Sequence, residues 1–293
     1  MNRFIKNSLF FLLFFAFFFT LVNLIYLGLL VSTDEGFKKR LQSLKFDDPD
    51  FELLVLGTSF AEYGIDTEYL TTNGIKSFNL ALAGNSFETS YIQLNEYLTQ
   101  YSHRPDYVLL VFNSYKEPTD SDIIEPIIEA TMLDYKYGLK DAPILRFTWL
   151  GTEMIKKLLS HKHRKARLVY GQVKFEKSNP DNTAYDDIIL NPEIIESRSW
   201  GGEIAKLCDN NGIKLILVEI PGFRDTQNIS EIGPYEINFI NGHSSILYNF
   251  NSQEFCKIFD SKKDWIGRSH LNEFGAEKFT KELLDMIKSQ TNK

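Results

Sequence analysis

The sequence predicts an α/β protein with a doubly wound, mainly parallel β-sheet and a transmembrane helix at its N-terminus. Short apolar runs bounded by turn residues are typical of strands that are buried on both faces. Segments with helical periodicity lie between several of these runs, and this alternation favours a parallel sheet with right-handed crossover connections. An almost unbroken apolar stretch near the N-terminus is long enough to cross a membrane as a helix.

The expected strands and helices follow one another along the chain after that apolar stretch. Each strand is a short run of apolar residues, and the last one is weaker than the others. The final helix has Asn272 as its expected N-cap and apolar residues at helical spacing behind it. Strands are expected at 52–56, 77–82, 107–113, 214–220 and 257–259, and helices at 87–100, 192–211 and after residue 272.

Residues 9–31 form the apolar stretch, and only Thr20 and Asn23 interrupt it with polar side chains. The stretch is longer than the apolar region of a cleavable signal peptide, and no convincing small-residue cleavage site ends it. We therefore interpret it as a membrane anchor, with a long signal peptide as the alternative.

Charged residues beside the anchor predict its orientation. Arg3 and Lys6 precede it, which favours a cytoplasmic tail at 1–8 and a body outside the cytoplasm. The basic residues at 38–40 weaken this asymmetry. We expect a single-pass protein of the cytoplasmic membrane, with its N-terminus inside, a stalk at 32–50 and a globular domain at 51–293 outside.

Composition excludes several classes of function. The formal net charge is −7, so the chain carries no global basic field and nucleic acid is not an expected partner. Neither G-x-x-x-x-G-K nor G-x-G-x-x-G occurs, which argues against nucleotide-dependent chemistry. We expect no cofactor. Cys208 and Cys256 lack the spacing of a zinc or redox site and would be two buried thiols or one disulfide.

Ser59 is the first candidate for chemistry. It follows the apolar run 53–56 and a Gly-Thr turn, which places it at the carboxyl edge of the predicted sheet, where ligands bind in open α/β folds. Backbone N–H groups at the start of the next helix could stabilise an oxyanion there. The alternative is a turn serine that only caps a helix.

His270 is the second candidate. It stands just before the final helix, so its ring would be firmly held yet partly exposed, which suits a general base near its ordinary pKa. A histidine at such a position can equally be a surface or capping residue. No companion ligands suggest a metal site at His161 and His163.

Together these segments resemble the SGNH, or GDSL-type, hydrolase superfamily, in which a serine follows strand one and a histidine precedes the last helix. The match covers most of the chain from residue 51, and the segment 269–276 carries it most strongly. The resemblance implies a flavodoxin-like fold and an oxyanion hole built from the N–H groups of Ser59 and Gly84 and the amide of Asn113. Thr58 and Val111 depart from the family, which has aspartate and glycine there.

The acid that would orient the histidine is missing from its usual place. The family carries an aspartate three residues before the histidine, and this chain has Gly267 there. Asp264 is the nearest upstream candidate, and Asp260 is another. Without either, a Ser–His dyad could still act, because oxyanion stabilisation and binding supply much of the rate.

Two regions exceed the minimal fold. An insertion at about 115–191 contains a basic run at 156–167, which is either a solvated helix face or a surface for anionic headgroups or an acidic polymer. The segment 222–252 follows the fourth strand, and we expect it to help form the substrate cleft.

The resemblance implies a membrane-anchored, extracytoplasmic serine esterase or O-acyltransferase of the bacterial envelope. Ser59 would be the nucleophile, His270 its base and Asp264 the orienting acid. The expected substrate is a cell-envelope polysaccharide or another acylated molecule, with a multi-spanning membrane acyltransferase as a further partner. The alternatives are an inactive binding or assembly protein with the same fold and a lipid esterase held at the membrane.

Overall fold

The computed structural model describes residues 2–33, 46, 49–112, 142, 144, 155, 166–176, 179–180, 192–222, 233–267 and 270–291. The chain divides into two compact units. One comprises Met1–Gln42 and Ile124–His163, and the other comprises Ser43–Ile123 and Arg164–Lys293.

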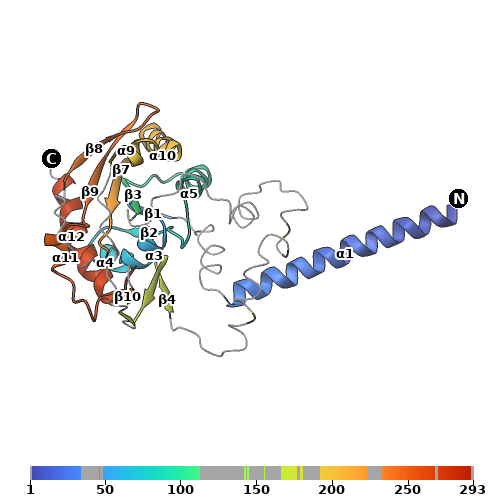
Figure 1. Ribbon diagram of the computed structural model, residues 1–293. Helices are drawn as coiled ribbons and strands as arrows, with labels where there is room; N and C mark the ends of the chain where they lie inside the picture. Colours follow the sequence, from blue (N-terminus) through green and yellow to red (C-terminus); the bar gives the residue numbers. More distant parts are fainter. Residues whose placement is uncertain are drawn as a thin grey trace. The chain divides into compact units, whose positions relative to one another are not determined.

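A six-stranded sheet forms the centre of the second unit, in the order β2-β1-β3-β7-β9-β8 (Figure 1). The first five strands in this order are parallel, and β8 joins the edge antiparallel to β9. With the parallel strands counted along the chain, their order is the 2-1-3-4-5 of flavodoxin-like folds. The α/β fold class is therefore confirmed. The strands are β1 Leu53–Gly57, β2 Ser77–Asn79, β3 Tyr107–Phe112, β7 Lys214–Glu219, β8 Tyr235–Asn238 and β9 Ser244–Asn249.

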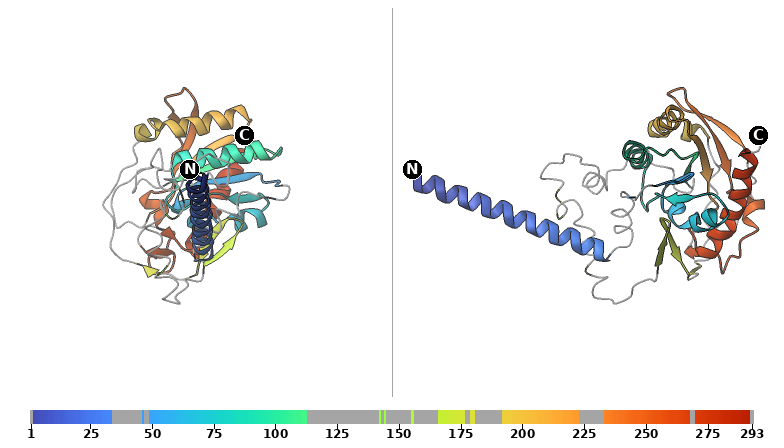
Figure 2. Two further views of the ribbon diagram at one scale, coloured as in Figure 1. Left: turned by 90° about the vertical axis from the view of Figure 1, so that its right-hand side faces the viewer. Right: turned by 180° about the vertical axis from the view of Figure 1, so that it is seen from behind.

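Helices cover both faces of this sheet, so its central strands are buried on both sides (Figures 1 and 2). Residues of α3, α4 and α12 pack on one face, and residues of α5, α9 and α10 pack on the other. Burial on both faces explains why the strand sequences are continuous apolar runs rather than alternating ones. The helices are α3 Ser59–Gly64, α4 Thr67–Thr72, α5 Phe87–Gln100, α9 Pro192–Glu196, α10 Ser199–Asn210, α11 Gln253–Cys256 and α12 Glu273–Thr291.

The fifth parallel strand differs from the expected one. Residues 257–259 lie in a turn and form no strand. The ring of Phe259 packs against Trp265. The fifth strand is β9, inside the segment 222–252 that we expected to line the cleft. Its buried positions are Ser245, Leu247, Tyr248 and Asn249, and this mixture of polar and apolar residues hid it. The expected helix at 192–211 is two helices, α9 and α10.

Short strands complete the unit. A two-stranded hairpin pairs β4 Ala166–Val169 with β5 Gln172–Phe175, inside the expected insertion. A small three-stranded sheet contains β6 Asn179–Pro180, β10 Trp265–Gly267 and β11 His270–Leu271. The pairing of β6 with β10 brings residues 179–180 beside the segment that precedes α12.

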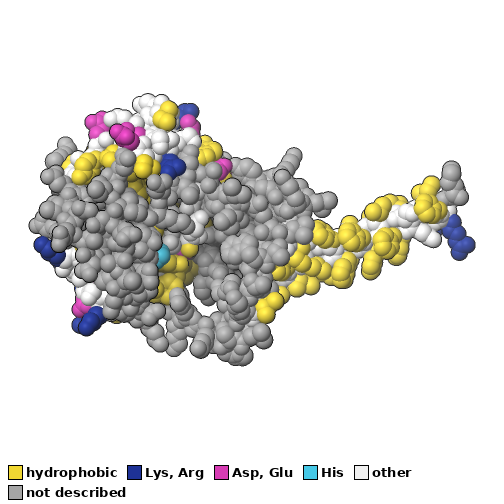
Figure 3. Space-filling view, viewed as in Figure 1, with side chains coloured by type: hydrophobic (Ala, Val, Ile, Leu, Met, Phe, Trp, Pro, Cys, Tyr) yellow, Lys and Arg dark blue, Asp and Glu magenta, His cyan; other side chains and the backbone are white. Residues whose placement is uncertain are grey.

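The first unit contains helix α1, Asn2–Thr33. Its segment Arg3–Tyr26 has a mean hydropathy of 2.5, so it is long and apolar enough to cross a membrane or to act as a signal sequence. Figure 3 shows hydrophobic side chains along the helix and Lys or Arg side chains at its N-terminal end. Asn23, one of the two polar interruptions, donates to the carbonyl of Phe19 at 2.8 Å and accepts from the N–H of Ile144 at 2.9 Å.

Candidate active site

Ser59 and His270 meet at the carboxyl edge of the sheet although they lie 211 residues apart in sequence. The distance between Ser59 Oγ and His270 Nε2 is 2.8 Å, which is hydrogen-bonding distance. Ser59 is the first residue of α3, and Thr58 caps this helix by accepting from the N–H of Phe60. The N–H of Ser59 is therefore one of the groups at a helix start that have no partner within the helix.

Gly57 produces the sharp turn that presents Ser59. It ends β1 with φ of +132°, and a Cβ atom there would lie 2.0 Å from the carbonyl oxygen of Val111 on β3. Only glycine tolerates both this conformation and this close approach. The chain can therefore leave the sheet directly after β1 and begin α3 with the serine.

His270 is held by the hairpin of β10 and β11 and by the helix that follows. Ile266 is its cross-strand partner in that hairpin. Two residues later the Asn272 side chain accepts from the N–H groups of Phe274 and Gly275, both at 3.0 Å. The expected N-cap of the final helix is thus confirmed, and it fixes the backbone that carries the imidazole.

Two aromatic side chains pack against the imidazole of His270, which is partly exposed. The ring of Phe60 stacks on it at a centroid distance of 4.7 Å, and the ring of Tyr63 meets it edge-on at 5.3 Å. Burial lowers the pKa of His270 to about 4, because a protonated imidazole loses hydration in such surroundings. The ring is therefore neutral at physiological pH and able to accept a proton. Reasoning from the sequence missed both aromatic residues, although their i, i+3 spacing on α3 places them on one helix face.

Asp264, the expected orienting acid, forms its side-chain hydrogen bonds with residues other than His270. Its Oδ2 accepts from the N–H of Asp260 and from Lys278 Nζ, both at 2.6 Å. Among the hydrogen bonds of the described residues, none joins Asp264 to His270. Through these two contacts the Asp264 carboxylate links the turn that begins at Asp260 to Lys278 on α12.

The expected oxyanion residues lie after neighbouring strands. Gly84 is exposed in the turn that follows β2 and has φ of +78°. The extension of β2 runs beside the end of β1, because the N–H of Leu82 donates to the Gly57 carbonyl at 3.1 Å. Gly84 is therefore at the same sheet edge as Ser59. Asn113 follows β3 directly but lies outside the described residues.

Buried polar side chains connect the serine helix to the loop that carries Gly84. Asn79 donates to the carbonyl of Ala61 at 2.8 Å and accepts from the N–H of Ala81 at 3.0 Å. The buried carboxylate of Glu62 accepts from the N–H of Ala83 at 2.9 Å. The sequence offered no pattern for these residues, because single polar side chains in apolar surroundings show no periodicity.

The described residues offer no metal site, since no group of three His, Cys, Asp or Glu side chains among them is placed to hold an ion. His161, His163 and most of the basic run at 156–167 lie outside the described residues. Of that run, Arg167 is described, and it forms an ion pair with Glu273 at 2.9 Å.

Comparison with known proteins yields only distant similarity. The sequence matches no family model and no curated protein. One similar solved structure, from Streptococcus pneumonia, was provisionally named a platelet activating factor; it has 13% identity and a TM-score of 0.40 over 92% of this chain and 98% of that one. Another, from Bacteroides fragilis NCTC 9343 and provisionally named an acylhydrolase, has 12% identity and a TM-score of 0.27 over 85% of this chain and 94% of that one.

Proposed function

We propose that this chain is an SGNH-like serine hydrolase or acyltransferase in which Ser59 is the nucleophile and His270 is its base. The observation that carries the proposal is the 2.8 Å contact between Ser59 Oγ and His270 Nε2. A serine is a weak nucleophile unless a base within hydrogen-bonding distance takes its proton. The lowered pKa of His270 leaves its ring neutral at physiological pH and so able to take the serine proton, but it also makes the ring a weaker base than an exposed imidazole.

The reaction begins with attack of Ser59 Oγ on the carbonyl carbon of an ester, while its proton moves to His270 Nε2. The carbonyl oxygen becomes an oxyanion, which the N–H groups of Ser59 and Gly84 and the amide of Asn113 stabilise. Collapse of this intermediate breaks the ester bond, and His270 returns the proton to the departing alcohol. Attack by water on the acyl-serine then releases an acid, whereas attack by an acceptor hydroxyl transfers the acyl group.

In this proposal Asp264 is not the acid that orients His270. That carboxylate is engaged by Lys278 and by the N–H of Asp260. Ser59 and His270 can act without that carboxylate because the oxyanion hole and substrate binding contribute a large part of the rate. An inactive binding protein would not need a paired serine and histidine at the sheet edge, so the 2.8 Å contact favours an enzyme.

The apolar helix sets the location in this proposal. With Arg3 and Lys6 before it, the helix would anchor the domain outside the cytoplasm. There the acyl group would be removed from, or added to, a cell-envelope polysaccharide, with a multi-spanning membrane acyltransferase as donor in the second case. Protease added to spheroplasts should digest the domain and spare a cytosolic control. Protection of the domain would refute this location without touching the chemistry at Ser59.

Turnover of a chromogenic acetyl ester by the full chain in detergent tests the chemistry. Wild type and Ser244→Ala, which alters an exposed serine on β9, should hydrolyse the ester equally. Ser59→Ala should be lower by at least about 10³-fold, the usual scale for loss of a nucleophile or its base. Adding an oligosaccharide acceptor then separates transfer from hydrolysis, and adding long-chain lipid esters tests the lipid esterase alternative. Equal turnover by Ser59→Ala would refute the proposal.

A further inference from the structure

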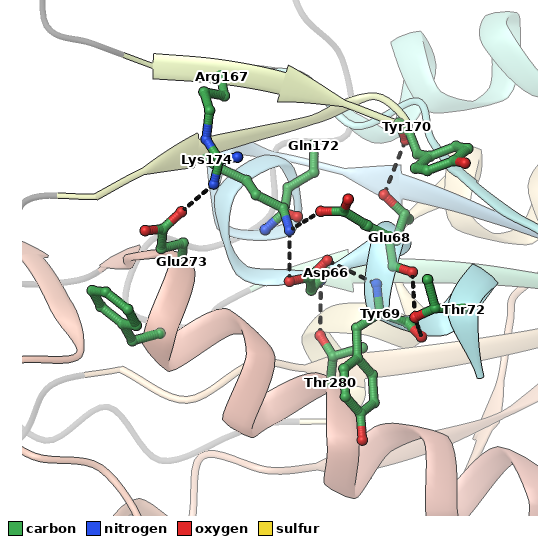
Figure 4. A network of polar contacts seen from close by, with 12 residues as sticks. Asp66, Glu68, Tyr69, Thr72, Arg167, Tyr170, Gln172, Lys174, Glu273 and Thr280 are labelled. Carbon is green, nitrogen blue, oxygen red and sulfur yellow. Dashed lines mark hydrogen bonds and ion pairs between the residues drawn. The ribbon is translucent and has the colours of Figure 1, made fainter.

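The β4–β5 hairpin is fixed to the domain by a buried ion pair. Lys174 Nζ lies 2.9 Å from Asp66 Oδ2 and 2.8 Å from Glu68 Oε2, and the side chains of Lys174 and Asp66 are only 7% and 6% exposed. Figure 4 shows Lys174 reaching from the hairpin to both carboxylates. Burial alone would lower the pKa of Lys174, but the hydrogen bonds to Glu68 and Asp66 outweigh it and raise the pKa. The lysine is therefore charged and paired.

Further contacts hold the tip and the outer strand of the hairpin. The carbonyl of Tyr170 accepts from the N–H of Asn79 and from Thr67 Oγ1, both at 3.0 Å. Arg167 pairs with Glu273 at the start of α12, directly after the segment that carries His270 (Figure 4). These contacts hold the hairpin against three separate elements, α4, β2 and α12.

The hairpin also contacts Tyr63, the aromatic residue that packs against His270. Gln172 is fully buried, and its Nε2 donates to the carbonyl of Tyr63 at 3.0 Å. Its Oε1 is buried and has no hydrogen-bond partner among the described residues, which is costly for an acceptor. The ring of Phe175 meets the Tyr63 ring edge-on at 5.2 Å, and Tyr63 meets His270 at 5.3 Å.

We propose that Tyr63, fixed by Gln172 and Phe175 of the β4–β5 hairpin, is a positioning residue that packs with Phe60 against the His270 ring and keeps water from it. The proposal rests on the proposed function of Ser59 and His270. It gives the hairpin, which lies outside the motifs of the sequence resemblance, a role in the reaction. Tyr63 acts through the base and takes no proton itself.

Three acidic groups on the elements that pack around His270 have partners of their own. On α3, Glu62 accepts from the N–H of Ala83. On α12, Glu273 pairs with Arg167, and the turn before β10 carries Asp264, which pairs with Lys278. Removing a neutral ring at Tyr63 or Phe175 leaves these charges in place. A change in the acid–base behaviour of His270 would then report its exposure to water.

Four variants of the full chain in detergent test the proposal. Tyr63→Ala opens one side of the imidazole, and Tyr63→Phe retains the ring. Phe175→Ala removes the support from the hairpin, and Tyr170→Ala removes an exposed ring from the tip of the same hairpin as a matched control. Both Tyr63 and Phe175 are only half-buried, so their replacement leaves the core of the domain intact. Thermal unfolding curves verify that each variant is folded.

The first readout is the rate of covalent labelling by a fluorophosphonate at pH 8 and pH 6. Wild type, Tyr63→Phe and Tyr170→Ala should label at nearly equal rates at the two pH values, because their histidine stays neutral at both. In Tyr63→Ala a histidine near the ordinary pKa of about 6.5 would be mostly protonated at pH 6, which gives about a fourfold loss between pH 8 and pH 6. Phe175→Ala should shift in the same direction by less.

The second readout is the titration of the His270 ring by NMR, assigned by the signal lost in His270→Asn. It does not require that Ser59 reacts, so it tests the positioning role even if wild type proves inert to the fluorophosphonate and the proposed function fails. An upward shift of the His270 titration in Tyr63→Ala and Phe175→Ala, absent from Tyr170→Ala, supports the proposal. Titration in Tyr63→Ala and Phe175→Ala at the wild-type pH overturns it.

Discussion

Replacing Lys174 by methionine tests whether the hairpin contributes to the stability of the domain. Methionine has a similar apolar volume but no charge, so the Asp66 carboxylate, 6% exposed, would lose its cation. Breaking a buried ion pair from one side costs about 3–5 kcal/mol, because the remaining charge stays buried without compensation. Glu68 is 44% exposed and adds little to this cost, since water solvates it once the lysine is gone.

Thermal unfolding of the full chain in detergent, followed by circular dichroism, measures this cost. For a domain of this size each 1 kcal/mol lowers the midpoint by about 2–4 °C, so a loss of about 3 kcal/mol predicts a decrease of about 6–12 °C. Lys206→Met is the matched control, because Lys206 and its partner Glu203 on α10 are 50% and 38% exposed and 3.5 Å apart. It should change the midpoint by no more than about 2 °C.

A second substitution separates the buried charge from general damage. Adding Asp66→Asn to Lys174→Met removes the unpaired carboxylate. The asparagine side chain can still cap α4 as Asp66 Oδ1 does, by accepting from the N–H of Tyr69. The double variant should therefore recover part of the lost stability. Lys174→Met with the same midpoint as Lys206→Met would refute the reasoning, and so would a double variant less stable than Lys174→Met alone.

Three further predictions concern the site itself. Ester turnover should stay near its maximum from pH 8 to about pH 5 and halve near pH 4. The reason is that burial lowers the pKa of His270 to about 4, and protonation below that pH removes the base. A midpoint near 6.5 in the pH–rate profile would contradict this. Gly57→Ala should destabilise the domain by more than about 3 kcal/mol in thermal unfolding, because its Cβ would lie 2.0 Å from a backbone oxygen. Gly212→Ala, with positive φ but open space, should cost only about 1 kcal/mol. Asp264→Asn should lower stability by about 1–2 kcal/mol through the lost contact with Lys278. Ester turnover of the folded variant should stay within about twofold of wild type, and a loss of orders of magnitude would support Asp264 as the orienting acid.

The central part of the fold could be predicted from the sequence because its strands are buried on both faces. β1, β3 and β7 are continuous apolar runs, and such runs are recognisable without knowledge of their neighbours. The edge was harder to predict, since β9 mixes serine and asparagine with apolar residues. Its place in the sheet depends on pairing with β7 and β8, which no local pattern contains.

The site shows the same division between local and long-range information. Ser59 and His270 stand at the ends of recognisable elements, so their turns and caps marked them in the sequence. The partners of Asp264 depend on how the turn from Asp260 folds and on a lysine 14 residues away on α12, and this was not predictable from spacing. The contact of the hairpin with Tyr63 joins residues 109 positions apart in the sequence, so only the structure reveals it.

Mass-spectrometric mapping of the fluorophosphonate adduct tests the central claim most directly. The full chain in detergent is treated at pH 8, digested and searched for every serine that carries the phosphonate. We predict one adduct, on the peptide that contains Ser59, and its loss in Ser59→Ala and in His270→Asn, which cannot take the serine proton. An adduct on a different serine, or equal labelling of Ser59 in His270→Asn, would contradict the account.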